Sequence, residues 1–365
     1  MRFTRPFWIF MFLPLCAAFA QSPDDNRSLG DIAREAREQK LLHASDVTPH
    51  SDRIRELIAD IGVNDADEYR GQMLELLNRE DFAGLEHAAE KASSGKGRFP
   101  GGVWKLYSFY DAVSQPAGGR QDRDASWNVH IAILNRWISL LPQSSTARIA
   151  LAQAYLSHGS KARGSGYADT VTDEGWQKYG ERADLALSIL QEVPNRDPYW
   201  YFAMMVVALE QGWPKSRTKA LLDESISFEA GFYHVYREYA NYLQPKWYGA
   251  PGDLEAFANA ISQRIGGEEG EFVYFEIASL FYCGACGNWS NPADMQWRKI
   301  KDGYAALEHL YGTSPLKMNR FALLAAKFGD KAAAREIFAQ IADHWDPGIW
   351  GDRQAFEKAK LWAEN

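Results

Sequence analysis

The segment that decides the fold is residues 145–191, STARIALAQAYL, SHGSKARGSGYADTVTDEGW and QKYGERADLALSILQ in succession. Its first part spaces its residues at the intervals of one helical face, which carries Arg148, Leu151, Ala152 and Tyr155. Its last part repeats that spacing with Ala183, Ala186, Leu187 and Leu190. Small alanines let two helices approach closely while larger side chains interlock. The pattern therefore predicts an antiparallel pair of helices over residues 145–156 and 177–191.

The connection between these two helices is unusually long. A tetratricopeptide-like unit joins its helices by a tight turn. Here residues 157–176 take the place of that turn. Connections of this length inside a compact domain are usually functional or disordered. We expect residues 157–176 to form an insert, which is either a binding loop or a structural plug packed against the helices.

The rest of the chain repeats the hairpin pattern. The expected pairs are 65–78 with 81–92, 103–112 with 125–141, 198–211 with 215–225, 232–243 with 254–264, 271–282 with 292–311, and 318–328 with 331–342, followed by a closing helix over 354–363. Each such unit buries its apolar face only against its neighbours, so several are needed for stability. We predict an all-α domain over residues 65–365, a tetratricopeptide-like α-solenoid of antiparallel helical hairpins. The alternative is an irregular all-helical domain.

The segment before this domain predicts export. Arg2 and Arg5 precede an apolar run, and a small-residue cleavage site ends at Ala20, so residues 1–20 are typical of a signal peptide. Cys16 does not favour a lipid anchor, because Leu15 stands where lipidation requires a small residue. Residues 21–64 are polar and predict a tether with a short helix around 29–42. We expect a periplasmic or secreted protein.

Composition and charge limit the classes of partner that the chain is expected to bind. The chain has 365 residues, of which 46% are hydrophobic and 24% charged, as in globular proteins. Its formal net charge is −8, which disfavours binding to nucleic acid or to anionic membrane surfaces. No later stretch approaches the length of an apolar membrane span, so we expect no transmembrane segment in the mature chain.

Four stretches together resemble a known family. They are FPGGVWKLYSFYDAV (99–113), SSTARIALAQAY (144–155), ARGSGYADTVTDEGW (162–176) and LQPKWYGAPGDLEAFA (243–258). Over about residues 82–264 the chain resembles the bacterial family called domain of unknown function 4034. The resemblance implies an exported or cell-envelope helical-repeat protein without an established activity. It implies no catalytic residues.

Cys283 and Cys286 form the one thiol pair outside the predicted signal peptide. A C-x-x-C motif is typical of thiol-redox proteins, but no alternating strand and helix pattern precedes it here. A zinc site would need two more ligands, which no nearby Cys or His pair supplies. In an exported protein the motif favours a structural disulfide, whose short loop would stabilise only modestly. Redox activity and free thiols stay open as alternatives.

Catalytic signatures are missing from the sequence. The eight His residues are scattered without metal-binding spacing, and there is no nucleophile elbow or phosphate-binding loop. Acidic pairs such as Asp169 with Asp173, or Glu268 with Glu269, could serve a glycosidase, although solvated surface is the commoner role. The sequence predicts no catalytic residues, no metal and no cofactor.

Three expanded turns suggest a recognition surface. Turns within the units of a hairpin array emerge on one edge, so residues 157–176, 244–253 and 283–291 should share a rim. They would bring together aromatic, basic and acidic side chains, namely Arg163, Tyr167, Asp169, Asp173, Trp176, Trp247, Tyr248 and Trp289. Rigid rings beside charged groups are typical of surfaces that bind peptide or sugar. The competing interpretation is that Tyr167, Trp176 and Trp247 are structural plugs.

These patterns favour a binding or scaffold protein over an enzyme. We expect an exported helical-repeat module for a peptide, protein or glycan partner in the periplasm or cell envelope. One alternative is an envelope enzyme that acts on a glycan through loop carboxylates. The other is a thiol-redox protein that uses Cys283 and Cys286.

Overall fold

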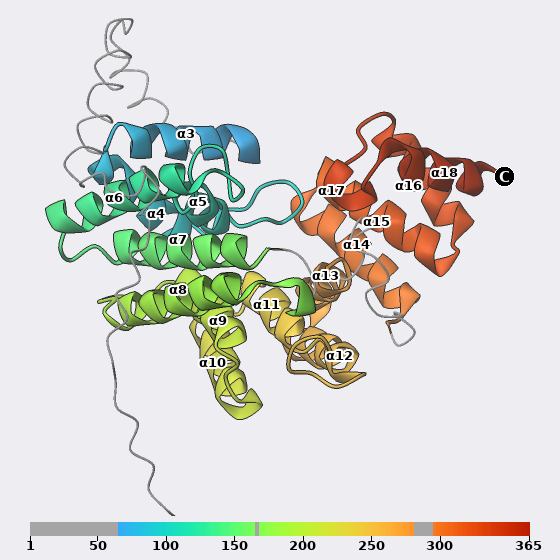
Figure 1. The fold of residues 1–365 in the computed structure, drawn as a ribbon. Helices are drawn as coiled ribbons and strands as arrows, with labels where there is room; N and C mark the ends of the chain where they lie inside the picture. The colour runs from blue at the N-terminus through green and yellow to red at the C-terminus, as the bar shows by residue number, and fades with distance from the viewer. Residues whose placement is uncertain (1–64, 165–167, 281–294) are drawn as a thin grey trace, which may run out of the picture. The chain divides into compact units, whose positions relative to one another are not determined.

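The structure is a computed structural model that describes residues 65–164, 168–280 and 295–365. Within these ranges it contains α-helices, one 3-10 helix and an isolated bridge between Arg98 and Trp104, and no β-strand. The predicted all-α class of packed helical hairpins is confirmed. In chain order (Figure 1) the helices are α3 (Ala66–Asn78), α4 (Phe82–Ser94), α5 (Lys105–Val113), α6 (Asp124–Leu140), α7 (Ser145–Arg163), η2 (Ala168–Thr170), α8 (Asp173–Gln191), α9 (Pro198–Glu210), α10 (Lys215–Phe228), α11 (His234–Tyr242), α12 (Asp253–Ile265), α13 (Gly267–Ala278), α14 (Trp297–Tyr311), α15 (Pro315–Phe328), α16 (Lys331–Ile341), α17 (Pro347–Trp350) and α18 (Arg353–Glu364).

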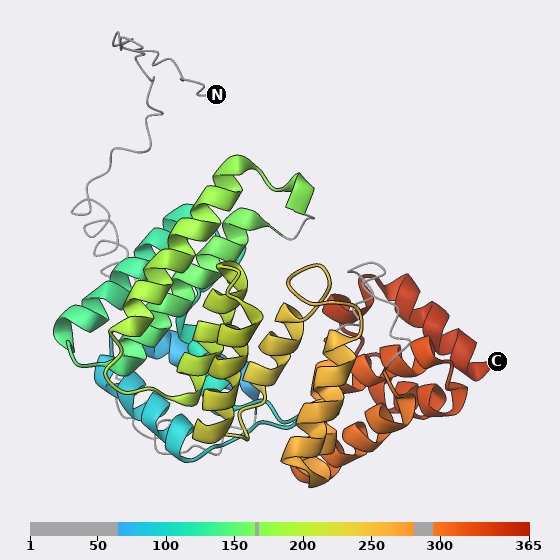
Figure 2. The ribbon, with the colours of Figure 1, turned by 90° about the horizontal axis from the view of Figure 1, so that it is seen from below.

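Most helices pack against a helix that precedes or follows them in the chain. The most extensive pairs are α7 with α8 and α13 with α14, followed by α12 with α13 and α15 with α16. The first pair runs side by side along most of its length (Figures 1 and 2). Further contacts of α6 with α7, α8 with α9, and α12 with α13 join each pair to the next. Stacking of successive hairpins in this way is the arrangement of an α-solenoid.

Local sequence signals set the helix ends. Asp197 caps α9 by accepting a hydrogen bond from the backbone N–H of Trp200 at 2.8 Å, and Pro198 occupies the first turn. Asp330 caps α16 in the same way through Ala333 at 3.1 Å. At the other end of a helix, α15 stops at Gly329, whose φ of 75° places it in the left-handed region that glycine tolerates. These caps fix where each hairpin turns.

Two glycines allow helices to touch backbone to backbone. A Cβ at Gly303 on α14 would lie 2.2 Å from the carbonyl oxygen of Glu271 on α13. A Cβ at Gly270 on α13 would lie 2.2 Å from the carbonyl oxygen of Ser262 on α12. No side chain fits at such distances, so glycine is required where α12, α13 and α14 pack together.

Helices α7 and α9 lie in the interior of the described domain. Helix α7 buries residues on all sides, including Ala150, Gln153 and Ser157, and α9 buries nearly all of its sequence PYWYFAMMVVALE. A helix that is apolar all round is a buried helix. Polar side chains on these two helices therefore face the protein interior or a cavity.

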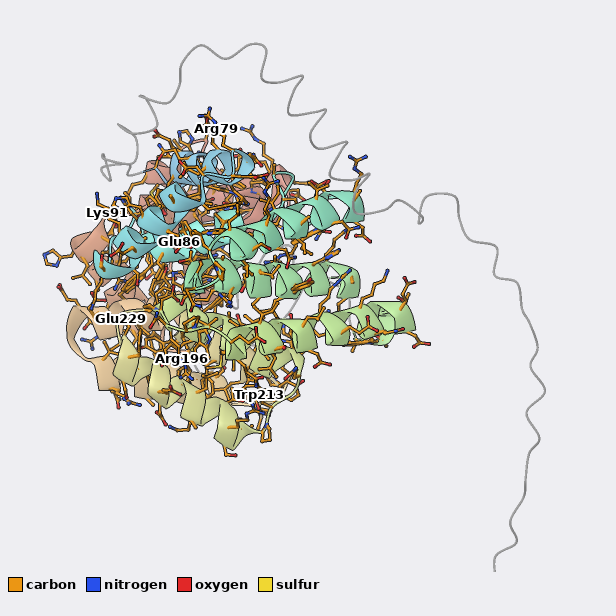
Figure 3. The ribbon with its side chains drawn as sticks, turned by 90° about the vertical axis from the view of Figure 1, so that its left-hand side faces the viewer. Arg79, Glu86, Lys91, Arg196, Trp213 and Glu229 are labelled. Carbon is orange, nitrogen blue, oxygen red and sulfur yellow. The ribbon has the colours of Figure 1, made fainter. Side chains whose placement is uncertain are left out.

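Glu86, which is labelled in Figure 3, joins three helices through polar contacts. Glu86 on α4 accepts a hydrogen bond from the indole N–H of Trp137 on α6 at 3.0 Å. It also accepts one from the hydroxyl of Ser144, which caps α7.

Within the described ranges no helix is both long and apolar enough to pass through a lipid bilayer.

The predicted insert over residues 157–176 is wrong, because the connection in the structure is shorter. Helix α7 continues to Arg163 and α8 begins at Asp173, so residues 164–172 are all that connects them. The helix continues because Ser157, His158 and Gly159 are buried. Arg182 on α8 holds this turn by donating to the carbonyl of His158 at 2.7 Å.

The predicted pairing of residues 103–112 with 125–141 is also wrong. Helix α5 packs mainly against α3 and α4, while α6 packs against α7. The long connection between α5 and α6 contains Pro116, Gly118 and Gly119 and does not hold its helices together as a tight turn would.

The predicted helix over 271–282 is displaced as well, because α13 begins at Gly267 and ends at Ala278. The predicted signal peptide (1–20), Cys16 and the tether (21–64) lie outside the described residues.

Candidate functional site

A polar cavity of ≈ 310 Å³ lies among α5, α7, α9 and α11. Its walls combine rings with side chains that donate and accept hydrogen bonds. Cavities of about this size or larger, with a few convergent polar groups, are the usual form of a small-molecule site. We call it the α7–α9–α11 pocket; its principal residues are Tyr107, Gln153, Arg163, Tyr199, Glu210 and Glu238.

Aromatic rings form one wall of this pocket. Tyr107 on α5 lies 5.4 Å from Phe202 and 5.8 Å from Tyr199, measured between ring centroids, and the latter two rings are 5.0 Å apart. The opposite face of Tyr107 stacks on His234 of α11 at 3.8 Å. These contacts hold the rings in fixed orientations, which makes them a preformed surface for a ligand to stack on.

Glu210 is the most unusual polar group in the pocket. It is the last residue of the apolar helix α9, and its carboxylate accepts one hydrogen bond, from the hydroxyl of Ser160 at 3.2 Å. Its Oε2 is buried and has no hydrogen-bond partner among the residues that the structure describes. Burial raises the pKa of Glu210 well above the usual 4.5.

A second carboxyl group, Glu238, reaches the same pocket from α11. Burial raises its pKa, although a hydrogen bond from the amide of Asn241 at 3.1 Å opposes the rise. On α7, the amide nitrogen of Gln153 donates to Ser157 at 3.3 Å. The amide oxygen of Gln153 has no partner in the described part of the chain. Two buried acceptor oxygens, of Glu210 and Gln153, and the buried indole N–H of Trp247 therefore lack hydrogen-bond partners among the described residues.

Two further groups complete the polar lining. Asp111 on α5 accepts hydrogen bonds from Gln115 at 2.8 Å and from Arg70, so its charge is paired. Arg120, in the connection between α5 and α6, reaches the pocket from the exposed surface. With Arg163 it gives the pocket two guanidinium groups as well as carboxyl groups.

The predicted rim residues divide into three groups. The structure brings together Arg163, Trp176 and Trp247: the guanidinium carbon of Arg163 lies 5.1 Å from the ring of Trp176 and 5.3 Å from that of Trp247. Arg163 and Trp247 line the pocket, so this cluster stands at its edge. Trp247 is half-buried against the core, whereas Trp176 is 36% exposed.

The other rim residues lie apart from the cavity or outside the described ranges. Tyr248 turns toward Tyr242, with 5.0 Å between the ring centroids. Asp169 on η2 and Asp173 at the start of α8 are exposed and do not line the pocket. The remaining predicted site residues, Tyr167, Trp289, Cys283 and Cys286, lie outside the described residues.

Sequence reasoning missed the interior of the pocket. Glu210 and Glu238 lie on helices whose sequence pattern predicts only packing, whereas the predicted site residues lie in the connections between helices. A signal was available for Glu210, since α9 offers one acidic residue at the end of an apolar helix. A carboxyl group at such a position must either reach solvent or be buried at a cost.

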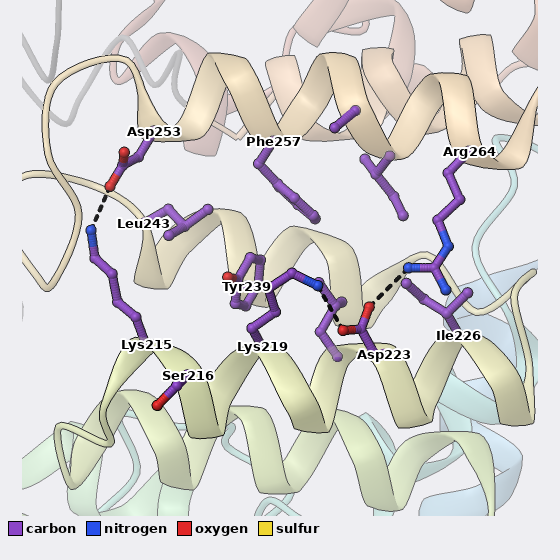
Figure 4. Close-up of a pocket in the computed structure, with 13 residues that line it drawn as sticks. Lys215, Ser216, Lys219, Asp223, Ile226, Tyr239, Leu243, Asp253, Phe257 and Arg264 are labelled. Atoms are coloured by element: carbon purple, nitrogen blue, oxygen red, sulfur yellow. Dashed lines mark hydrogen bonds and ion pairs between the residues drawn. The ribbon is translucent and has the colours of Figure 1, made fainter.

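A second cavity, of ≈ 450 Å³, lies between α10 and α12 over α11 (Figure 4). Its lining is mainly apolar. Lys215 pairs with Asp253 at 2.6 Å at one end, and Arg264 pairs with Asp223 at 2.8 Å at the other. These charges already satisfy one another, so this cavity offers a ligand less specific chemistry than the α7–α9–α11 pocket.

No cluster of three or more His, Cys, Asp or Glu side chains suited to a metal ion occurs within residues 65–164, 168–280 and 295–365. No family model, curated protein or solved structure matches the chain. Its functional class therefore rests on the helical-repeat fold and on the pocket. The resemblance to the family called domain of unknown function 4034 stays a prediction.

Proposed function

We propose that the chain is an exported helical-repeat protein that binds a small hydroxyl-rich ligand, such as a sugar unit of an envelope glycan, in the α7–α9–α11 pocket. The observation that carries this proposal is the buried Oε2 of Glu210, an acceptor without a partner among the described residues. An unsatisfied buried acceptor costs free energy that a ligand donor can recover. A ligand hydroxyl is such a donor.

The charge of the pocket favours a neutral ligand over a cation. Glu210 and Glu238 would attract an ammonium group, but Arg120 and Arg163 line the same pocket and would repel it. A sugar presents both donors and acceptors and meets carboxyl, amide and guanidinium groups equally well. Its flat C–H face packs on rings such as Tyr107 and Tyr199.

Titration calorimetry of the mature protein tests the proposal. The probes are common mono- and disaccharides, soluble cell-wall glycan fragments and, as a separate arm, short peptides. We expect one-site binding to a saccharide and at least tenfold weaker binding by Glu210→Met, which removes both acceptor oxygens at similar length. A tenfold loss corresponds to about 1.4 kcal/mol.

Glu357→Met is the matched control, because Glu357 lies exposed on α18 and does not line the pocket. Its binding should equal that of the wild type. Binding of peptides alone would show that the ligand class is wrong. Undiminished saccharide binding by Glu210→Met would contradict the role of the pocket itself.

One observation also favours catalysis as a second candidate. Glu210 and Glu238 both have raised pKa values in one pocket, and a general acid must hold its proton near neutral pH. The predicted glycan enzyme would then act through these helix carboxyl groups and not through Asp169 or Asp173. Chromatography of cell-wall fragments after incubation should show new products that Glu210→Gln does not release. The thiol-redox alternative concerns Cys283 and Cys286, which the structure does not describe.

A further inference from the structure

A buried cluster of charges lies on α11, α13 and α15, outside the residues that line the α7–α9–α11 pocket. At its centre Glu276 on α13 is fully buried and forms an ion pair with Lys317 on α15, whose side chain is 1% exposed. Arg237 on α11 places its Nη1 3.6 Å from Oε2 of Glu276. That separation is too long for a hydrogen bond, so Lys317 pairs with Oε1 of Glu276, while Oε2 has only the ion pair with Arg237 and no hydrogen-bond partner among the described residues.

Positive charge exceeds negative charge in this cluster. Arg320 lies one helical turn from Lys317 on α15, and its pKa is lowered to about 10, first by burial and then by Arg237. The pKa of Lys317 is lowered to about 7 by burial, and Arg320 and Arg237 add to the shift although Glu276 opposes it. Three basic groups therefore share one buried carboxylate.

The other acidic side chain near Arg320 already has a role. Asp346 acts on the pKa of Arg320. It is also the N-cap of α17, where its carboxylate accepts a hydrogen bond from the backbone N–H of Ile349 at 3.1 Å. Asp346 therefore offsets part of the positive charge at Arg320, although Arg237, Lys317 and Arg320 still outnumber the two carboxylates.

Several donors in the cluster are left without acceptors. Within the described ranges, Nε of Arg237 and both Nε and Nη1 of Arg320 are buried and have no hydrogen-bond partner. The same holds for the hydroxyl of Tyr233, a fully buried ring whose pKa responds to Glu276, Arg237 and Arg320. A donor left unpaired inside a protein costs free energy, and a charged donor costs more than a neutral one.

We infer that Arg237, Arg320 and Tyr233 form a second binding site, which takes a small oxyanion of the carboxylate or phosphate type beside the Glu276–Lys317 pair. A guanidinium presents its N–H groups in a planar fork that matches two oxygens of such an anion. The tyrosine hydroxyl supplies a neutral donor. The anion would pair donors that the fold leaves unsatisfied and would offset the surplus of positive charge.

Thermal unfolding and calorimetry with inorganic phosphate test this site. Titrations are made at constant ionic strength, with acetate as a second probe that separates the two oxyanion types and potassium chloride as the reference salt. We expect phosphate or acetate to raise the melting temperature saturably, because a ligand that binds the folded state alone stabilises it. Arg320→Gln and Arg237→Gln should each weaken this binding at least tenfold.

Arg298→Gln is the matched control, since the side chain of Arg298 on α14 is 91% exposed. It should bind both probes as the wild type does. Without added oxyanion, Arg320→Gln should melt no lower than the wild type, because it removes a buried charge that lacks a full partner. An equal response to chloride, or undiminished binding by both arginine variants, would overturn the site. So would a large loss of stability in Arg320→Gln together with no response of the wild type, which would mark Arg320 as purely structural.

Discussion

The α7–α9–α11 pocket and the Glu276 cluster share helix α11 and differ in charge balance: the pocket sets carboxyl groups beside guanidinium groups, whereas basic groups outnumber carboxylates around Glu276. Arg237 and Glu238 are consecutive on α11, and consecutive helical positions point about 100° apart. Glu238 therefore lines the pocket, and Arg237 lies 3.6 Å from Glu276 in the cluster. One short helix thus contributes a charged side chain to each of two regions in which buried polar atoms lack partners among the described residues.

A neutral ring stands between the two regions. His234 stacks on Tyr107 of the pocket, and burial, followed by Arg237 and Lys317 of the cluster, lowers its pKa well below 6.5. Packed apolar residues would stabilise either region at least as well as its partly satisfied charges do. Stability alone therefore does not account for these groups, and the two proposed ligands, one hydroxyl-rich and one anionic, would account for them by different chemistry.

The largest expected effect tests the cluster. Glu276→Gln removes the one buried carboxylate and leaves Arg237, Lys317 and Arg320 facing one another. We expect a loss of about 3–5 kcal/mol in the free energy of unfolding, because it leaves buried charge uncompensated. Urea unfolding followed by circular dichroism measures it. The double variant Glu276→Gln with Lys317→Met should recover part of the loss, and Glu357→Gln should stay within about 0.5 kcal/mol of the wild type.

The second effect concerns packing at the edge of the pocket. Trp247 is half-buried against the core and lies on Arg163. Trp247→Ala should cost about 2 kcal/mol, roughly half the loss seen for a fully buried tryptophan. The same urea titration applies. A negligible cost would show that Trp247 is not a plug and would leave recognition as its sole role.

The third effect is the pH dependence of stability that Glu210, the pocket carboxyl group to be compared with Glu276, should produce. Because the pKa of Glu210 is raised, the folded protein holds a proton there at pH values where the unfolded chain, with a pKa of 4.5, has released it. Stability from this group is therefore present below about pH 4.5 and is lost as the pH rises through the folded-state pKa.

Glu210→Gln removes that titration. The variant should match the wild type at low pH and exceed it by about 1–2 kcal/mol at alkaline pH, where a desolvated carboxylate is replaced by a neutral amide. Unfolding free energies measured at several pH values decide the question. A difference that does not change with pH would mean that Glu210 is ionised at little cost and would weaken the contrast with Glu276.

The sequence predicted the fold well because its signals are local. Periodic apolar faces, caps such as Asp197 and Asp330, and the stop at Gly329 act within a few residues of one helix. The extent of the 157–176 connection was not predictable in the same way. The helical preference of Ser157, His158 and Gly159 is weak. Helix α7 extends through these residues because they are buried against neighbouring helices such as α8.

The candidate site was predictable only at its edge. Arg163, Trp176 and Trp247 stand out because aromatic and basic residues are conspicuous in Gly-rich and Pro-rich turns. Glu210 and the Glu276–Lys317 pair depend on contacts between residues far apart in the sequence, which no local pattern contains. An interior glutamate becomes informative only when its surroundings are known.

The smallest expected effect concerns Trp176, which contacts Arg163 but does not line the pocket. It is 36% exposed and contacts Tyr179 edge to face. Trp176→Ala should change the free energy of unfolding by less than about 0.5 kcal/mol, as surface substitutions usually do. If the rim serves recognition, a ligand longer than the pocket would extend across Arg163 onto this ring.

Binding of sugars of increasing length separates the two interpretations of Trp176. A monosaccharide that fills the pocket should bind the Trp176→Ala variant as well as it binds the wild type. A longer oligosaccharide should lose a few-fold in affinity, since stacking on one exposed ring contributes about 1 kcal/mol. Equal affinity at every length would restrict recognition to the pocket. A loss of several degrees in melting temperature would instead identify Trp176 as a structural plug, because a ring that only binds ligand contributes nothing to the stability of the free protein.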